Sequence, residues 1–151
     1  MRIGVISDTH NRLRPQALKA MAGVDFILHA GDIGEPEILE QLRSLAPVAA
    51  IRGNTDVTGP CSALPATEVV ELAGQSVYML HSLAEIDLDP EAAGFAAVIS
   101  GHTHRPLIEQ RGKVLYLNPG SAGPRRFSLP VSLGFLTIDG SNLRGETMTL
   151  L

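Results

Sequence analysis

Gly101-His102-Thr103-His104 is the stretch from which the rest of this sequence is best interpreted. It follows the short apolar run 96–99, which is typical of a buried strand. If that run is a strand, alternate residues at its end point the same way, and both imidazoles leave its tip on one side. Neutral imidazole is a good ligand for zinc, copper, iron and nickel. A metal ion needs more than two such ligands, so the others must come from elsewhere in the chain.

The composition is that of an ordinary globular protein. The chain has 151 residues, 44% of them hydrophobic and 19% charged, so we expect one domain, residues 1–151. Cys61 is the only cysteine, which excludes an internal disulfide and fits a reducing compartment. We expect a cytoplasmic location without a membrane partner, because there is no signal-peptide layout and no apolar run as long as a membrane span. The formal net charge of −4 argues against duplex DNA as a partner but leaves small anions open.

The order of the predicted elements favours two kinds of sheet connection. Apolar runs at 3–6, 26–28 and 48–51 predict buried strands, separated by helices predicted at 15–21 and 35–45. Hairpins are predicted at 67–80, 107–117 and 133–150, where turn residues separate paired apolar runs. Between them, Asp89-Pro90 suggests a helix start, but Gly94 leaves room for little more than a turn or two. Because helix crossovers favour parallel strands and hairpins are antiparallel, we expect a layered α/β sandwich of two facing sheets with helices outside.

Polar side chains follow five of the predicted strands. Ligands bind at the carboxyl ends of strands in open α/β sheets, so these five strand tips could converge on one site. The set holds four histidines, two carboxylates and one amide, which exceeds the needs of one ion and suits two divalent ions that share an aspartate. Its members are Asp8, His10, Asp32, Asn54, His81, His102 and His104.

Each of these motifs has an ordinary structural explanation when it is taken alone. Asp8-x-His10 is usually a turn or capping pair, and Gly-Asp and Gly-Asn are common turn dipeptides. A lone His81 would be a half-buried sheet residue. The metal site is favoured because all five motifs follow predicted strands in one small chain. We exclude His29, which lies inside a predicted strand and is expected in the core or behind the ligands.

The ordered set Asp8-x-His10, Gly31-Asp32, Gly53-Asn54, His81 and Gly101-His102-x-His104 resembles the calcineurin-like metallophosphoesterase superfamily. The compact size and Asn118-Pro119-Gly120-Ser121 resemble its small prokaryotic phosphodiesterase branch, and the resemblance covers roughly residues 1–139. It implies a four-layer α/β/β/α sandwich of two facing mixed sheets with outer helices. By this resemblance one metal binds Asp8, His10, Asp32 and His104, and the other binds Asp32, Asn54, His81 and His102.

The activity implied by the resemblance is hydrolysis of a small organic phosphodiester by a hydroxide that bridges two divalent metal ions. Asp32 and Asn54 are the residues expected to act in catalysis. Manganese is the first expectation for the metal, although iron, zinc, nickel and cobalt accept the same ligands. Metal-bound water reaches a pKa near ~7, so hydroxide is available at neutral pH.

Contacts with the rest of the substrate are less clearly marked. Asn11 and Thr55 neighbour ligands on loops and are expected to contact phosphate. Several arginines are candidates for gripping the substrate, although each alone is more often surface charge. These are Arg12, Arg14, Arg52, Arg105, Arg125 and Arg126.

Two positions depart from the common superfamily pattern. Thr55 stands where many members have a histidine that protonates the leaving group, and Ser82-Leu83 follows His81 where many have Gly-His. We therefore expect a more open pocket with no obvious proton donor. A phosphomonoesterase and a protein-binding scaffold without turnover stay open as alternatives. Nucleic acid is not an expected partner, because a basic stripe and interleaved aromatics are lacking, whereas a homo-oligomer is compatible with the sequence.

Overall fold

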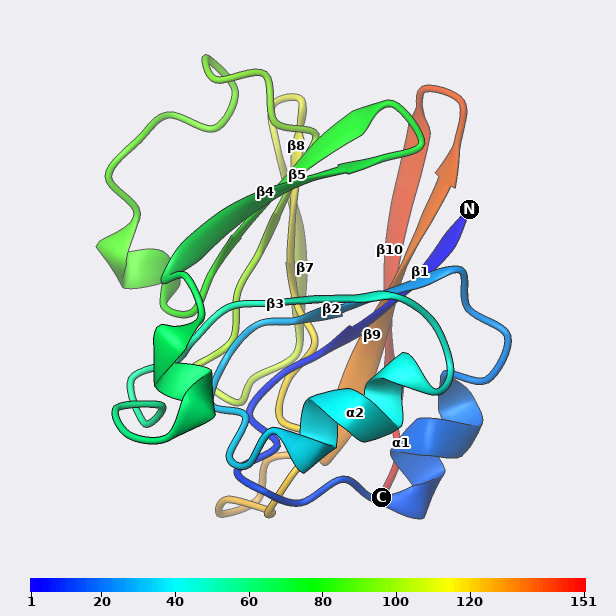
Figure 1. The fold of residues 1–151 in the computed structure, drawn as a ribbon. Helices are drawn as coiled ribbons and strands as arrows, with labels where there is room; N and C mark the ends of the chain where they lie inside the picture. The colour runs from blue at the N-terminus through cyan, green and yellow to red at the C-terminus, as the bar shows by residue number, and fades with distance from the viewer.

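Ten strands form two mixed five-stranded sheets in the computed structural model, which describes residues 1–151 (Figure 1). The first sheet has the order β10-β9-β1-β2-β3 and the second the order β4-β5-β6-β8-β7. The first contains β1 (Arg2–Ile6), β2 (Phe26–His29), β3 (Val48–Ala50), β9 (Ser132–Asp139) and β10 (Asn142–Thr149). The second contains β4 (Thr67–Leu72), β5 (Gln75–Leu80), β6 (Ala97–Ile99), β7 (Leu107–Arg111) and β8 (Val114–Asn118). The predicted α/β fold of two facing mixed sheets is confirmed.

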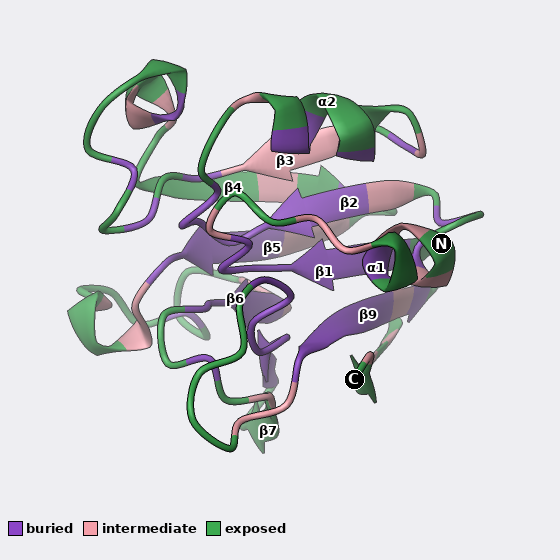
Figure 2. Cartoon of the chain, turned by 90° about the horizontal axis from the view of Figure 1, so that it is seen from below, coloured by how far each residue is buried: buried purple, intermediate pink, exposed green.

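Parallel strands joined by helices make up the first part of the chain. Helix α1 (Pro15–Ala20) connects β1 to β2, and α2 (Glu37–Arg43) connects β2 to β3. The register pairs Val5 with Leu28 and Leu28 with Ala49. Figure 2 shows the arrows of β1, β2 and β3 pointing the same way, so their carboxyl ends share one edge of the sheet.

The hydrophobic core is divided by the first sheet. Val5 of β1 packs into the cluster between the two sheets, together with Met79 of β5. The next residue, Ile6, belongs instead to the cluster under the helices, with Met21 and Leu42. This alternation follows from the two-residue period of a strand. Burying side chains of this size contributes about 1.5–3 kcal/mol each, so both faces of β1 hold the layers together.

The outer face of the second sheet is covered by the segment 82–95. Phe95 stacks on Tyr78 of β5, with ring centroids 5.0 Å apart. The segment contains the 3-10 turn η2 (Leu83–Glu85) and one further turn after Asp89, which ends at Gly94 with a φ of 81°. No α-helix forms here, because the left-handed Gly94 ends the turn that Asp89-Pro90 begins, as the sequence suggests.

The predicted elements occur with small differences at their ends. The helix expected at 35–45 spans Glu37–Arg43, because Pro36 is its N-cap and Pro47 follows soon after its C-cap. The 3-10 turn η1 (Pro60–Ala63), between β3 and β4, was not predicted.

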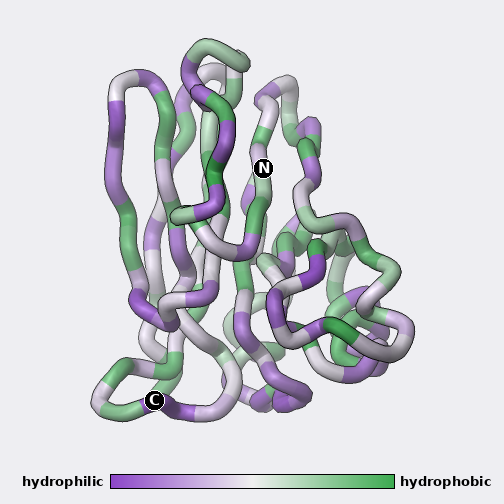
Figure 3. The backbone as a smooth tube through the Cα atoms, turned by 90° about the vertical axis from the view of Figure 1, so that its left-hand side faces the viewer, coloured by the Kyte–Doolittle hydropathy of each residue, from purple (hydrophilic) through white to green (hydrophobic).

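No helix of the structure is long and apolar enough to cross a membrane. The longer α-helix, α2, has 7 residues. Hydrophobic stretches along the chain are short and alternate with hydrophilic ones (Figure 3).

Candidate metal centre

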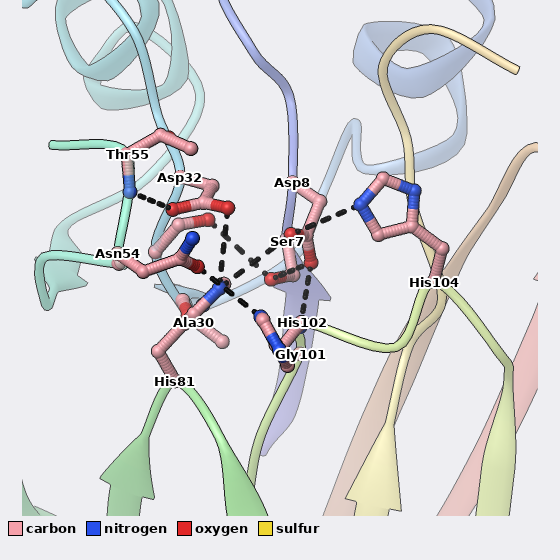
Figure 4. Close-up of polar contacts among 12 residues, drawn as sticks. Ser7, Asp8, Ala30, Asp32, Asn54, Thr55, His81, Gly101, His102 and His104 are labelled. Carbon is pink, nitrogen blue, oxygen red and sulfur yellow. Dashed lines mark hydrogen bonds and ion pairs between the residues drawn. The ribbon is translucent and has the colours of Figure 1, made fainter. Parts of the chain in front are cut away.

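Loops from the carboxyl ends of five strands meet at one edge of the two sheets (Figure 4). β1, β2 and β3 of the first sheet lead to Asp8 with His10, to Asp32 and to Asn54, while β5 and β6 of the second lead to His81 and to His102 with His104. Backbone hydrogen bonds fasten neighbouring loops together. The Asp8 N–H donates to Gly31 O at 3.0 Å, and the Gly101 N–H donates to His81 O at 2.9 Å. The structure thus brings the seven predicted side chains to one place.

Two buried carboxylates lie among the histidines. Asp8 Oδ1 is 3.3 Å from His104 Nε2 and 3.7 Å from Nε2 of both His10 and His81. Asp32 Oδ2 is 3.2 Å from His81 Nε2 and 3.6 Å from His10 Nε2. Two groups of three ligands result, Asp8-His10-His104 and Asp8-Asp32-His81, and the donor atoms of each lie within 4.8 Å of one another.

Four buried side-chain atoms of these residues have no hydrogen-bond partner: Asp8 Oδ1, His10 Nε2 and His81 Nε2, which lie at the centre of the cluster, and His104 Nδ1, the ring nitrogen that does not face Asp8. Buried polar atoms are nearly always paired, because leaving one unpaired costs about 1–3 kcal/mol. Carboxylate oxygens and imidazole nitrogens are ligands for divalent transition metals. The residues present therefore fit divalent metal ions.

The protein holds the second oxygen of each carboxylate. Asp8 Oδ2 accepts hydrogen bonds from Ser7 Oγ at 2.7 Å and from the His102 N–H at 3.1 Å. Asp32 Oδ1 accepts one from the Thr55 N–H at 2.9 Å. Each carboxylate is thereby oriented so that one oxygen is free to face the histidines, as ligands in metal sites are oriented by their neighbours.

The protonation of His81 is set by its backbone partner. His81 Nδ1 lies 2.7 Å from Ala30 O. A carbonyl oxygen can only accept, so Nδ1 carries the proton and Nε2 offers a lone pair when the ring is neutral. Nε2 faces both Asp8 and Asp32, which is the position of a metal ligand.

His29 has no free nitrogen for a metal. Its ring is fully buried, Nδ1 accepts a hydrogen bond from the Gly31 N–H at 3.1 Å, and Nε2 lies 3.0 Å from Thr9 Oγ1. The Thr9 hydroxyl donates to Ile33 O, so the His29 Nε2–H donates to Thr9. Burial lowers the pKa of His29 to about 4, which keeps the ring neutral. His29 lies behind the cluster and braces the loops that carry it.

Asn54 and His102 lie at the exposed edge of the cluster. Asn54 Oδ1 is 3.1 Å from His102 Nδ1, and the His102 ring packs edge-on against His81 with centroids 5.2 Å apart. The two predicted ligands are therefore close to His81, but the amide oxygen and this ring nitrogen are engaged with each other.

The predicted geometry of the two paired histidines was wrong in one respect. β6 ends at Ile99, and both His102 and His104 have left-handed backbones with φ of 72° and 62°. Side-chain alternation holds only for extended chain, so the two rings do not leave a strand tip on one side. Figure 4 shows His104 beside Asp8, while His102 points toward Asn54.

Left-handed backbone conformations are concentrated in these loops. Of the eight non-glycine residues with positive φ, six belong here, with φ between 44° and 72°: Asp8, His10, Asn11, Asp32, His102 and His104. The conformation typically costs about 1–2 kcal/mol per residue, although Asn, Asp and His adopt it more readily than most. Strain gathered at one place is typical of functional sites.

Two glycines permit the close approach of the loops. A Cβ at Gly53 would collide with the Asp32 carboxylate, and one at Gly101 would collide with Ser7 Oγ and Asp8 Oδ2. A side chain at either position would push a carboxylate out of place.

The charges of the cluster stabilise one another. Burial raises the pKa of Asp8, but contacts with His10 and His104 outweigh it, and the pKa falls far below its usual range. Burial also raises the pKa of Asp32, and His81 reverses the shift. Contact with Asp8 raises the pKa of His10. Both carboxylates are ionised at neutral pH, as metal ligands must be.

The cluster is open to solvent on two flanks. A hollow of about 380 Å³ is lined by Asn54, His81 and His102 together with Arg52, Glu85 and Asp87, among others. A second hollow of about 240 Å³ is lined by His10, His104, Pro124, Arg125 and Arg126. A molecule bound at the centre can therefore extend in either direction.

The predicted phosphate contacts have roles in holding the loops. Asn11 Oδ1 accepts a hydrogen bond from the Glu35 N–H at 3.1 Å. Thr55 orients Asp32 through its backbone, and its side chain is exposed. Neither side chain lines the two hollows.

Asp56 supports the site and was missed in the sequence. Its buried carboxylate accepts hydrogen bonds from the N–H groups of Ile33 at 3.1 Å, Gly34 at 3.3 Å and Gly53 at 2.8 Å. It thus ties the loop after β2 to the loop after β3. The only signal was an aspartate that closes a Gly-Asn-Thr-Asp turn.

The fold and the site together define an α/β protein of two mixed sheets with a candidate metal centre at the strand ends. Residues 1–141 match the family model for the calcineurin-like phosphoesterase superfamily domain. A probable metallophosphoesterase of Methanothermobacter thermautotrophicus is 40% identical over an alignment that covers 97% of this chain and 91% of the relative. The chain belongs to the calcineurin-like phosphoesterase superfamily. The phosphodiesterase YfcE of Escherichia coli is 29% identical, over 92% of this chain and 89% of its own.

Solved structures share the fold. A structure described as a novel archaeal phosphodiesterase superposes with a TM-score of 0.80 at 23% identity, covering 98% of this chain and 100% of its own. Vps29 of Entamoeba histolytica in complex with zinc superposes with a TM-score of 0.75 at 22% identity, covering 100% of both chains. At these identities the likeness concerns the fold alone.

Proposed function

We propose that this chain is a phosphodiesterase that uses two divalent metal ions to hydrolyse a small organic phosphodiester. The observation that carries the proposal is a set of three buried atoms without partners, Asp8 Oδ1, His10 Nε2 and His81 Nε2, with His104 Nε2 beside them, in a member of a phosphoesterase superfamily. Bound metal ions would supply Lewis acidity and a water molecule of lowered pKa.

In this proposal Asp8, His10, Asp32 and His104 hold one ion, and Asp32, Asn54, His81 and His102 hold the other. The proposal makes Asp32 the shared ligand, and its free Oδ2 lies 3.6 Å and 3.2 Å from the Nε2 atoms of His10 and His81. Asp8 Oδ1 lies 3.7 Å from the same two nitrogen atoms, so it supports the centre from the other side. Ser7 and Thr55 keep the two carboxylates in place through hydrogen bonds to the opposite oxygens. Manganese is our first choice of metal, and iron, zinc, nickel and cobalt suit the same donors.

A diester fits the surroundings of the centre better than a monoester. A phosphodiester carries an organic group on each side of the phosphorus, and the cluster opens into a hollow on each flank. The name of the relative YfcE, a phosphodiesterase, points to the same substrate class.

The test is a comparison of metal-reconstituted protein on bis(p-nitrophenyl) phosphate and p-nitrophenyl phosphate. We expect turnover of the diester with at least one of the five metals, and slower turnover of the monoester. His104→Gln should lose the activity, and Asp139→Ala, an exposed carboxylate at the far end of β9, should keep it. Inactivity toward both substrates with every metal would contradict the proposal.

A protein-binding scaffold without turnover is the second candidate. An apolar hollow of about 430 Å³ beside the loop after β6 favours it, with Leu83, Pro106, Leu107, Tyr116 and Leu129 among its lining residues. Metal-dependent turnover by the wild type, lost in His104→Gln, would exclude this candidate.

A further inference from the structure

Four arginines gather on one flank of the metal centre. Arg125 and Arg126 line the smaller hollow, whose other walls are His10, His104 and Pro124. Arg12 and Arg14 belong to the loop that follows His10. Burial lowers the pKa of Arg14, and the charges on Arg12 and Arg125 lower it further.

Hydrogen bonds to backbone carbonyl groups fix the loop that carries Arg125 and Arg126. Arg14 donates through Nε and Nη2 to Gly123 O, at 3.3 Å and 3.2 Å. Arg125 Nε donates to Leu129 O at 3.3 Å. These contacts occupy one edge of the Arg14 guanidinium and the Nε of Arg125, and the Nη groups of Arg125 have no protein partner.

No carboxylate neutralises the four arginines. The arginine ion pairs of this chain are Arg2 with Glu146 and Arg111 with Glu109, and neither pair includes one of the four arginines. The chain has a formal net charge of −4, so an unpaired positive flank runs against its overall balance. A concentration of like charge costs free energy in the folded state unless an anion binds there.

The hollow on the opposite flank of the metal centre is lined by acidic side chains. The larger hollow contains Glu85 and Asp87, and its one arginine, Arg52, donates through Nη1 to Leu64 O at 2.7 Å. An anionic group would be repelled there by the two carboxylates. The two flanks therefore distinguish the two ends of a bound molecule by charge.

We propose that the natural substrate carries a second anionic group, a phosphate or a carboxylate, which Arg125 and Arg126 bind while the phosphodiester lies at the metal centre. This inference rests on the proposed function and narrows its substrate class. Guanidinium groups bind such oxyanions through two parallel N–H donors, which gives direction as well as affinity. The neutral or cationic end of the substrate then occupies the hollow beside Asn54 and His81.

The first experiment uses two p-nitrophenyl phosphodiesters with the same leaving group, whose other ester group is either propyl or 3-phosphonopropyl. In the wild type we expect the phosphonopropyl ester to have a kcat/KM about tenfold above that of the propyl ester, mainly through KM. Arg125→Ala/Arg126→Ala should abolish this preference, so that kcat/KM for the phosphonopropyl ester falls about tenfold more than kcat/KM for the propyl ester. Arg105→Ala is the control, because this arginine follows His104 directly but lines the apolar hollow instead. Equal losses on both esters in the double variant would overturn the inference.

A binding measurement separates this inference from the proposed function. Propane-1,3-bisphosphonate and propylphosphonate are titrated calorimetrically into manganese-loaded protein. The wild type should prefer the bisphosphonate, and the preference should fall with salt and disappear in Arg125→Ala/Arg126→Ala. A preference that survives in the double variant would place the second anion elsewhere and overturn the inference. If the preference behaves as expected but no diester is hydrolysed, the proposed function fails and the anion site stands.

Discussion

The Nε2 atom of His104 lies 3.3 Å from Oδ1 of Asp8, although the first residue follows a strand of the second sheet and the second follows a strand of the first. The candidate metal centre is thus a junction between the sheets. Its side chains provide part of the contact that holds the two sheets at this edge. Metal bound at this centre should therefore stabilise the fold.

The first prediction follows from this junction. Removing metal with a chelator should lower the midpoint of thermal unfolding. Metal at 100 times its dissociation constant adds about 2.7 kcal/mol, which corresponds to roughly 5–10 °C for a chain of this size. Differential scanning calorimetry with and without added manganese measures the shift. In His104→Gln the midpoint of thermal unfolding should respond much less to metal. An equal response in both proteins would contradict the claim that metal bound between the two sheets stabilises the fold.

Asp32→Ala tests the shared ligand. Its free Oδ2 faces both His10 and His81, so its loss should weaken both metal positions and reduce diesterase activity by at least about a hundredfold. Metal content by atomic emission after dialysis is the measurement. Asp139→Ala, which removes an exposed carboxylate, should retain the wild-type metal ratio. Two tightly bound metals and normal turnover in Asp32→Ala would refute the assignment.

His29→Gln separates a bracing residue from a ligand. The variant loses at least one of the contacts with Thr9 and Gly31, so its free energy of unfolding should fall by about 1–3 kcal/mol while metal content stays near normal. His102→Gln should show the reverse, with less bound metal and, when both proteins are metal-free, nearly unchanged stability. A fall in metal content in His29→Gln as large as that in His102→Gln would move His29 into the ligand set.

His29 also predicts how the free energy of unfolding depends on pH. Burial lowers the pKa of His29 to about 4 in the folded protein, against about 6.5 in the unfolded chain. Between these values the unfolded chain binds a proton that the folded chain does not. The contribution of His29 to stability is therefore complete above pH 6.5 and is lost as the pH falls toward 4, by roughly 3 kcal/mol in total. Urea unfolding of apo-protein across this range should show a steeper acid loss in the wild type than in His29→Gln, and parallel curves would contradict the assignment.

Thr55 predicts a dependence on the leaving group. Its side chain is exposed and contains no acid, and its contact with Asp32 is made by the backbone. General acid catalysis typically contributes 10²–10⁴-fold, so kcat/KM should fall steeply as the pKa of the leaving group rises from nitrophenols to alkyl alcohols. Thr55→His keeps the backbone contact and should flatten the slope if the ring reaches the departing oxygen. A shallow slope in the wild type would reveal a proton donor elsewhere in the pocket.

The sequence by itself determined the kinds of element and the places where polar residues follow them. Apolar runs of three to six residues mark β1, β2 and β5, and Pro15 and Gly94 mark where turns begin and end, because these signals act over a few residues. The motifs from Asp8-x-His10 to His102-x-His104 were also visible, since strand ends in α/β sheets are where ligands bind. Their order along the chain carried the resemblance to the superfamily.

The tertiary structure decided how these side chains meet. Left-handed backbones at His102 and His104 turn the two rings to different partners, which strand alternation could not predict. Contacts between distant loops settle that His29 has no free nitrogen and that Asp56 binds two loops together. Arg14 likewise joins the loop after β1 to the loop before β9 through its hydrogen bond to Gly123. The physical reason is that loop conformation depends on hydrogen bonds and packing between segments far apart in the chain, which local sequence does not encode.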